Sequence, residues 1–152
     1  MTELQPTFEP ASVPIRPAAT VMLIDDRPDL QVLMLERHAN TVFAGGMWVF
    51  PGGAVDERDD PRYFDQVATH RTDLEASQLL DLPQGGLAYY MAAVRETFEE
   101  AGVLLALHRE DESPVKIDLH SSDRFTQYRD QLNAAETDLK SILNAEALLA
   151  DV

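Results

Sequence analysis

The sequence contains no cysteine, and this absence excludes a whole class of chemistry. A chain without thiols has no disulfide framework, no thiolate metal site and no cysteine nucleophile. It also leaves the redox compartment open, because such a chain is compatible with oxidising and reducing surroundings alike. Catalysis or metal binding by this protein must therefore use other ligands and nucleophiles.

Long apolar runs are also missing from the start of the chain. The first twenty residues contain acidic side chains and several prolines but no apolar stretch. They match neither a secretory signal nor a membrane span. We therefore expect a cytoplasmic protein.

Basic side chains are scarce. Twelve Lys and Arg residues stand against twenty-seven Asp and Glu residues, which gives a formal net charge of −15. This charge argues against a nucleic acid or an anionic membrane as the main partner. A small molecule that carries phosphate can still bind, provided that a divalent cation or a local cluster of arginines offsets the repulsion.

The remaining composition is that of one globular domain. Of the 152 residues, 45% are hydrophobic, which is enough for a sizeable core. We divide the chain into a flexible N-terminal segment, 1–17, and a single domain, 18–152. Within the domain, the apolar runs 19–24 and 30–37 flank a turn rich in Asp and Pro and predict a β-hairpin. Residues 47–50 predict a third strand, since a proline and two glycines follow them.

The second half of the chain reads mainly as helix. Residues 58–87 are polar, and we interpret them as an insertion that contains one short helix. An apolar stripe that starts at Leu87 predicts a long helix, which should end at Gly102. A strand is expected at 103–107, and a helical segment covers about 121–150.

Three carboxylates lie close together on the long predicted helix. Glu96, Glu99 and Glu100 are three and four residues apart, so their side chains share one side of the helix. Their mutual repulsion, and their position near a negative helix C-terminus, are unfavourable unless something positive compensates. A hard divalent cation, which prefers carboxylate oxygens, would do so. A solvated acidic face is the alternative interpretation.

The stretch "RETFEEAGV", with "PGGAVD" upstream of it, resembles the Nudix box, G-x5-E-x7-R-E-U-x-E-E-x-G-U, in which U is a bulky apolar residue. Two positions depart from it: Thr97 stands where a large aliphatic residue is usual, and Leu87 stands where the box glutamate is expected. Six positions of the nine-residue part match, namely Arg95, Glu96, Glu99, Glu100, Gly102 and Val103.

The box is also split, because the insertion separates the glycine loop from Arg95. The residue that pairs with Arg95 stays open among Asp56, Glu57 and Asp59. A split box of this kind resembles the coenzyme A diphosphatase (Nudix motif 19-like) branch of the family. The resemblance covers roughly residues 18–107.

The resemblance implies an α/β fold, an α/β/α sandwich around a mixed sheet, and a hydrolase that uses Mg²⁺ or Mn²⁺. Such an enzyme cleaves the diphosphate linkage of a nucleoside diphosphate derivative, with coenzyme A or acyl-coenzyme A as the expected substrate. Glu99 and Glu100 would be metal ligands, and Glu96 a further ligand or the base that orients water. The Gly53 carbonyl would be a backbone ligand, and Arg95 would hold the glutamates.

Two further residues are candidates for substrate binding, together with Gly53. Gly52 belongs to the same glycine loop, and Arg37 follows a predicted strand, where its guanidinium could meet a phosphate. A charged residue at a strand end is more often simply solvated.

Members of this family normally continue with more strands and a closing helix after the box. Here only about fifty residues follow Val103, and they read mostly as helix. We therefore expect a fold that is incomplete at its C-terminus, either truncated or completed by another chain. An uncovered sheet edge would favour a homo-oligomer. The alternative function is a non-catalytic remnant that acts as a binding or interaction module.

Overall fold

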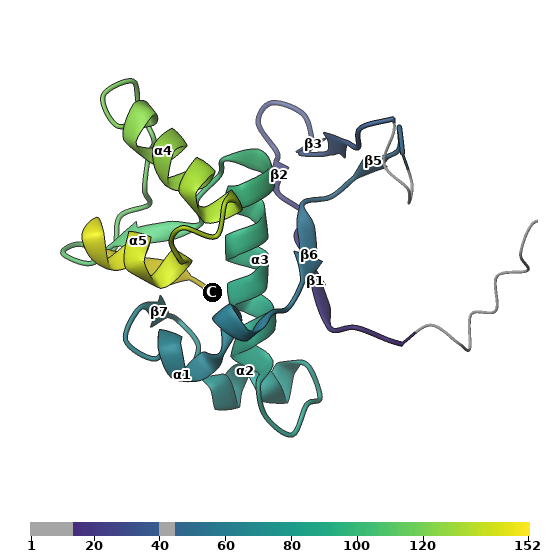
Figure 1. Cartoon of the computed structure of the whole chain (residues 1–152), viewed down its shortest axis with the longest axis vertical. Coiled ribbons are helices and arrows are strands. Elements are labelled where there is room, and N and C mark those ends of the chain that lie inside the picture. Colours follow the sequence, from purple (N-terminus) through teal and green to yellow (C-terminus); the bar gives the residue numbers. More distant parts are fainter. Residues whose placement is uncertain (1–13, 40–44) are drawn as a thin grey trace, which may run out of the picture.

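The computed structural model describes residues 14–39 and 45–152, so most of the predicted N-terminal segment 1–17 lies outside the described residues. The fold is mixed α/β, as predicted. The 16-residue helix α3 (Gly86–Ala101) runs through the middle of the molecule, with the N-terminal strands on one side and the C-terminal helices on the other (Figure 1). No helix in the described ranges is long and apolar enough to cross a membrane.

The other elements are short. The helices besides α3 are η2 (Glu57–Asp59, a 3₁₀ turn), α1 (Pro61–Phe64), α2 (Asp73–Leu79), α4 (Ser122–Asn133) and α5 (Leu139–Ala145). The strands are β1 (Ala18–Thr20), β2 (Ile24–Asp25), β3 (Gln31–Val32), β4 (Leu35–Glu36), β5 (Trp48–Val49), β6 (Gly52–Ala54), β7 (Ala68–Thr69), β8 (Ala106–His108) and β9 (Leu148–Asp151).

Both ends of α3 are stabilised by identifiable groups. At its start, the Asp73 carboxylate accepts the N–H of Gly85 at 3.0 Å, and the Ser77 hydroxyl accepts the N–H of Gly86 at 2.8 Å. These side chains from α2 satisfy donors that a helix N-terminus leaves free. At its end, Gly102 adopts the left-handed φ of 70° that favours glycine, so the predicted stop is confirmed. The short helix predicted within 58–87 is thus α2, and it supports the helix that carries the carboxylates.

The core lies between α3, the C-terminal helices and a three-stranded sheet. Phe98 of α3 meets Phe125 of α4 edge to face, with ring centroids 6.4 Å apart. The buried apolar side chains of α3 at this core are Leu87, Met91, Val94 and Phe98. The sheet has the order β7–β9–β8, with β9 parallel to β7 and antiparallel to β8. One of its strands, β7, comes from the polar segment 58–87.

The end of the chain corrects one prediction. We expected helix through about residue 150, but α5 ends at Ala145 and β9 follows it. Ala147 has a positive φ of 52°, which breaks the helix. Leu148 and Ala150 are then buried on the same face of an extended strand. Their spacing of two is that of a strand, and β9 is held by pairing with β7 and β8.

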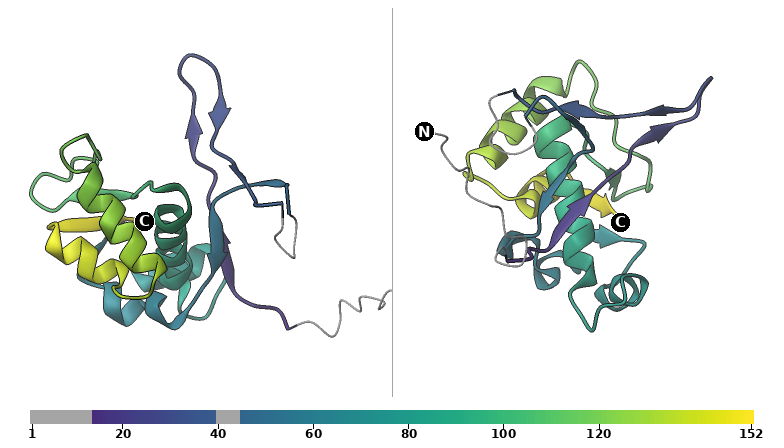
Figure 2. Two further views of the ribbon diagram at one scale, coloured as in Figure 1. Left: turned by 45° about the horizontal axis from the view of Figure 1, so that its top comes forward. Right: turned by 90° about the vertical axis from the view of Figure 1, so that its right-hand side faces the viewer.

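The N-terminal strands form an arm on the other side of α3. Strands β1 and β6 pair antiparallel beside α3, and the hairpin β2–β3 and the pair β4–β5 extend beyond them, away from the helices (Figure 2). The predicted hairpin is confirmed by the pairing of Ile24 with Val32, and the predicted third strand by β5. We call residues 22–34 and 47–48 the apolar arm, because large exposed side chains gather there: Met22, Ile24, Leu30, Val32, Leu33, Met34, Met47 and Trp48.

Candidate functional site

Arg95 is the centre of the site. Its side chain is 3% exposed, and its Nε and Nη2 atoms donate to the two carboxylate oxygens of Asp59 at 2.9 and 2.8 Å. Nη2 also donates to the Ala54 carbonyl of β6 at 2.9 Å. Burial opposes the charge of Arg95, but the hydrogen bonds and charges of Asp59 and Glu96 outweigh burial and raise its pKa. Arg95 is therefore a fixed, permanently charged group that ties α3 to β6 and η2.

Asp59 answers the question of which residue pairs with Arg95. It is 1% exposed, and its second oxygen also accepts the N–H of Asp56 at 2.9 Å, which fixes the carboxylate in η2. A signal for it was present in the sequence. Asp59 follows Gly53 at the spacing that the G-x5-E part of the box requires, with the acid one methylene shorter. Asp59 stands at the very start of the segment 58–87, which we interpreted as an insertion, so the acid stays close to the glycine loop.

The two departures from the box are accommodated inside the core. Leu87, which stands at the standard distance from Arg95 for the box glutamate, is 1% exposed and packs among apolar side chains. Thr97 is fully buried, and its hydroxyl donates to the Ala93 carbonyl one turn earlier at 2.7 Å. Because the hydroxyl is satisfied within the helix, threonine is tolerated at an apolar position.

Arg95 also holds two of the three clustered glutamates. Its Nη1 atom donates to Glu96 at 2.8 Å and to Glu99 at 3.2 Å. Burial raises the pKa of Glu99, the charge of Glu96 adds to this effect, and the charge of Arg95 opposes it. Glu99 is thus a partly desolvated carboxylate whose charged form would gain from a further cation.

The glycine loop meets the third carboxylate and packs against the first. The N–H of Gly52 donates to Glu100 at 2.9 Å. A Cβ atom built on Gly53 would lie 2.4 Å from the Glu96 carboxyl group, closer than any real contact. Glycine at this position therefore leaves the room that the Glu96 carboxylate occupies. The fold brings both glycines to the helical glutamates, while their role in substrate binding stays a prediction.

The donor chemistry of this cluster suits a hard divalent cation, but the carboxylates do not converge on one point. Within residues 14–39 and 45–152, no group of three or more Asp, Glu or His side chains lies close enough to hold a metal ion. Glu96 and Glu99 turn to Arg95, and Glu100 turns to Gly52. Carboxylate oxygens beside an open glycine backbone are the ligands that Mg²⁺ and Mn²⁺ prefer. To hold such an ion, the three side chains would have to turn toward a common position.

Arg37, the other predicted substrate-binding residue, is not brought to this cluster. It follows β4, and its backbone N–H donates to the Met47 carbonyl at 2.9 Å. The pair β4–β5 belongs to the N-terminal strands and lies away from α3 in Figure 1 and in the left view of Figure 2. Arg58, which we had not singled out, adjoins the cluster, because it precedes Asp59 in η2 and Asp59 pairs with Arg95.

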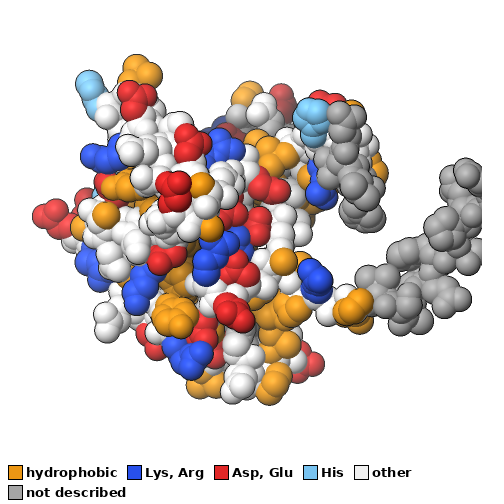
Figure 3. All heavy atoms as spheres, viewed as in Figure 1, with side chains coloured by type: hydrophobic (Ala, Val, Ile, Leu, Met, Phe, Trp, Pro, Cys, Tyr) orange, Lys and Arg blue, Asp and Glu red, His pale blue; other side chains and the backbone are white. Residues whose placement is uncertain are grey.

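A second arginine that the sequence did not reveal lies at the C-terminal end of α3. Arg129 of α4 donates to the carbonyls of Glu99 and Glu100 at 2.7 and 2.6 Å. A cation here interacts favourably with the negative end of the helix dipole. Across the face drawn in Figure 3, basic side chains are interspersed with acidic ones despite the net charge of −15. Arg129 thus binds the C-terminal carbonyls of α3, while Arg95 binds the carboxylates of Glu96 and Glu99.

Comparison with known proteins gives one informative match. No protein-family model matches the chain. The structure is similar to the crystal structure of a NUDIX hydrolase from Alicyclobacillus acidocaldarius, with a TM-score of 0.65 and 27% sequence identity. The match covers 92% of this chain and 58% of that protein, so the chain spans little more than half of the length of the protein it matches. This similarity supports a Nudix-type fold for the chain.

Proposed function

We propose that this chain is a metal-dependent hydrolase of the Nudix type, which cleaves a diphosphate linkage in a nucleoside diphosphate derivative. The observation that carries the proposal is the buried Arg95, which joins Asp59 to Glu96 and Glu99 beside the glycine loop. The similarity in fold to a Nudix hydrolase supports it over 92% of the chain.

In this proposal each residue has a defined task. Glu99, Glu100 and the Gly53 carbonyl would hold Mg²⁺ or Mn²⁺, with Glu96 as a further ligand or as the base that orients water. A bound cation of this kind neutralises the diphosphate and lowers the pKa of the attacking water. Arg95, whose charge is fixed by Asp59, keeps Glu96 and Glu99 in place. An acidic protein can then bind an anionic substrate.

We propose coenzyme A or acyl-coenzyme A as the substrate, because the box is split as in the branch that acts on it. A panel of coenzyme A, NADH, nucleotide sugars and nucleoside triphosphates tests this proposal with Mg²⁺ or Mn²⁺ present. We expect coenzyme A to yield a pantetheine phosphate and an adenosine bisphosphate. If the enzyme prefers another diphosphate, the proposed substrate is wrong but the proposed hydrolase activity stands. If folded, metal-loaded protein hydrolyses no member of the panel, the proposed hydrolase activity is wrong.

The first prediction concerns metal affinity. Replacing Glu99 and Glu100 together by glutamine should weaken Mn²⁺ binding by more than about tenfold, since two charged oxygen ligands are lost. Titration calorimetry measures the affinity. The matched control replaces Glu110 and Glu112, two exposed glutamates of the loop after β8, by glutamine. Equal affinity in the two double variants would refute the ligand assignment.

A second candidate function is a non-catalytic binding or interaction module, and the apolar arm favours it. Trp48 of β5 is 60% exposed and Ile24 of β2 is 58% exposed, and large apolar side chains exposed together in one part of a fold often mark an interaction surface. A well-folded protein that binds metal but hydrolyses nothing in the panel would support this function over the hydrolase.

We also propose that the chain self-associates through the apolar arm, whose strands leave edges unpaired within the described residues. Sedimentation at micromolar concentration should therefore show a species larger than a monomer. Replacing Ile24 and Trp48 by glutamate should return it to a monomer. Leu119→Glu is the control, because Leu119 is 94% exposed but lies outside the arm. A compact wild-type monomer that unfolds cooperatively would contradict self-association.

A further inference from the structure

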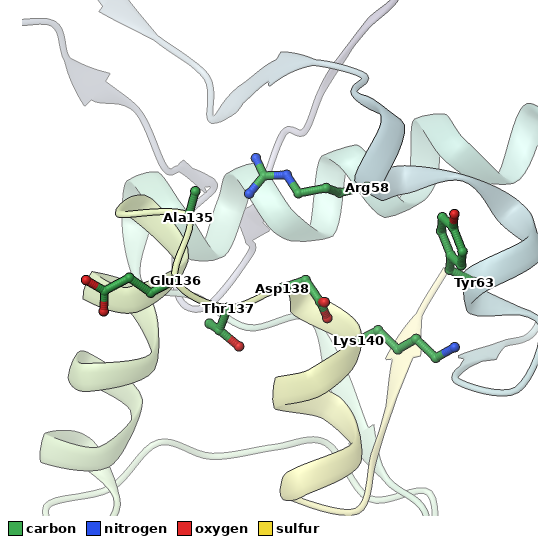
Figure 4. A pocket seen from close by; sticks show the side chains of 7 residues that line it. All are labelled: Arg58, Tyr63, Ala135, Glu136, Thr137, Asp138 and Lys140. Atoms are coloured by element: carbon green, nitrogen blue, oxygen red, sulfur yellow. The ribbon is translucent and has the colours of Figure 1, made fainter.

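A cavity of about 500 Å³ lies between the loop that joins α4 to α5 and the segment η2–α1, with α3 behind it (Figure 4). Its volume is in the range of small-molecule sites. Three of its lining side chains matter for recognition, namely Arg58, Tyr63 and Lys140. None of the three was assigned a role above, and two of them are cationic.

Arg58 links this cavity to the glutamates of α3. It precedes Asp59 in η2, and Asp59 pairs with Arg95, which in turn binds Glu96 and Glu99. Its Nε and Nη2 atoms donate to Asp56 at 3.0 and 2.8 Å. Nη1 has no hydrogen-bond partner in the part of the chain that the structure describes, so one edge of the guanidinium remains available. The proposed site of diphosphate cleavage and the cavity therefore meet at Arg58.

Lys140 stands at the other end of the cavity. Its Nζ atom lies 6.0 Å from the centroid of the Tyr63 ring, and in Figure 4 the side chain extends toward Tyr63 and away from Arg58. The side chain is half-buried, and it forms no ion pair with any described residue. A half-buried ammonium group without a carboxylate partner is a favourable place for an anion.

Neither acidic residue of the lining forms an ion pair with Lys140 among the described residues. The Asp138 carboxylate accepts the N–H of Ser141 at 2.7 Å and thereby caps its own helix, α5. Glu136 extends away from the other labelled side chains in Figure 4. The cavity thus presents a cation at each end, and the end at Arg58 adjoins the glutamates.

We propose that the cavity holds the part of the substrate that lies beyond the diphosphate, and that Lys140 binds a further phosphate group carried by that part. This inference rests on the proposed function. With the diphosphate beside Arg58 and the glutamates, a ligand that runs along the cavity reaches Lys140 with its far end. The substrate class is then a nucleoside diphosphate derivative that bears an additional phosphate monoester on the nucleoside.

Two compounds that differ only in this phosphate test the inference, coenzyme A and dephospho-coenzyme A. For the wild type we expect kcat/KM to favour the phosphorylated compound by roughly tenfold, the size of one charge-assisted contact. In Lys140→Gln the ratio of the two kcat/KM values should fall to about one, because kcat/KM falls more for coenzyme A than for dephospho-coenzyme A. Lys116→Gln is the control, because Lys116 is the other lysine of the chain and lies exposed before α4. An unchanged preference in Lys140→Gln overturns the inference.

Binding without turnover separates this inference from the proposed function. Adenosine 3′,5′-bisphosphate and adenosine 5′-monophosphate are titrated into wild type, Lys140→Gln and Lys116→Gln without metal, and circular dichroism checks that each variant is folded. If the protein prefers the bisphosphate and loses this preference only in Lys140→Gln, the result supports a phosphate-binding role for Lys140, even if no substrate is hydrolysed. If the wild type binds both nucleotides equally, the cavity does not recognise a further phosphate group and the inference is wrong, even if coenzyme A is hydrolysed.

Discussion

Asp59→Ala should lower the free energy of unfolding by about 3 kcal/mol, because it leaves the buried guanidinium of Arg95 without its bidentate partner. Glu96 and Glu99 compensate only part of this charge, since both bind the same Nη1 atom. Arg95→Met should destabilise the protein in turn, because Asp59 would then be a buried carboxylate without a cation. Urea unfolding followed by circular dichroism measures both effects.

The double variant shows whether the two residues act as a pair. Its destabilisation should be smaller than the sum of the single effects by about 1 kcal/mol or more, as expected for residues in one ion pair. Glu57→Gln is the matched control, because Glu57 is exposed in the same 3₁₀ turn, and its effect should stay within about 0.5 kcal/mol. Strict additivity, or a control as unstable as Asp59→Ala, would mean that η2 and not the pair is being disturbed.

Glu96→Gln should reduce kcat by about 10² to 10⁴ and change KM much less. Glutamine keeps the size of the side chain, and its oxygen can still accept from Arg95, but it can neither take a proton nor supply a full negative charge. The lost interaction therefore belongs to the transition state, while the ground-state contacts to phosphate survive. Steady-state kinetics with saturating Mg²⁺ give the two parameters.

Glu110→Gln is the control for the expected fall in kcat of Glu96→Gln. Glu110 is an exposed glutamate outside the cluster, so this variant should retain the wild-type kcat. The assignment of Glu96 fails if its variant keeps more than about a tenth of the wild-type kcat, because acid–base or metal-ligand roles contribute more than that. A large rise in KM at constant kcat would instead assign Glu96 to substrate binding.

The elements that the sequence predicts well are those set by local patterns. Helix α3 carries a continuous apolar stripe and ends at a glycine in the left-handed conformation, and both features can be read within one segment. Strand β9 was missed because alanine and leucine, which favour helix, make up most of residues 145–150 and continue the composition of α5 without a glycine or proline. Only the pairing of β9 with β7 and β8, which are far away in the sequence, selects the strand.

The same distinction holds for the site. The glutamates of α3 and Arg95 were identified because they stand within six consecutive residues of one helix. Asp59 was one of three open candidates, since 36 residues separate it from its partner. The positions of Arg58 and Arg129 beside the cluster depend on how η2 and α4 pack on α3, which no local pattern encodes. The position of Arg37 depends in the same way on the direction of the arm, which is a tertiary property, and its role in substrate binding stays a prediction.

The ion pair between Asp59 and Arg95 also closes a loop, and polymer statistics explain why this loop can be long. Closure entropy grows only with the logarithm of loop length, so an increase from about eight residues to the observed 36 costs about 1.3 kcal/mol. Helix α2 shortens the effective loop, because Asp73 and Ser77 already bind the start of α3. The intervening segment can therefore vary in length and sequence at little entropic cost, as long as its two anchored ends are kept.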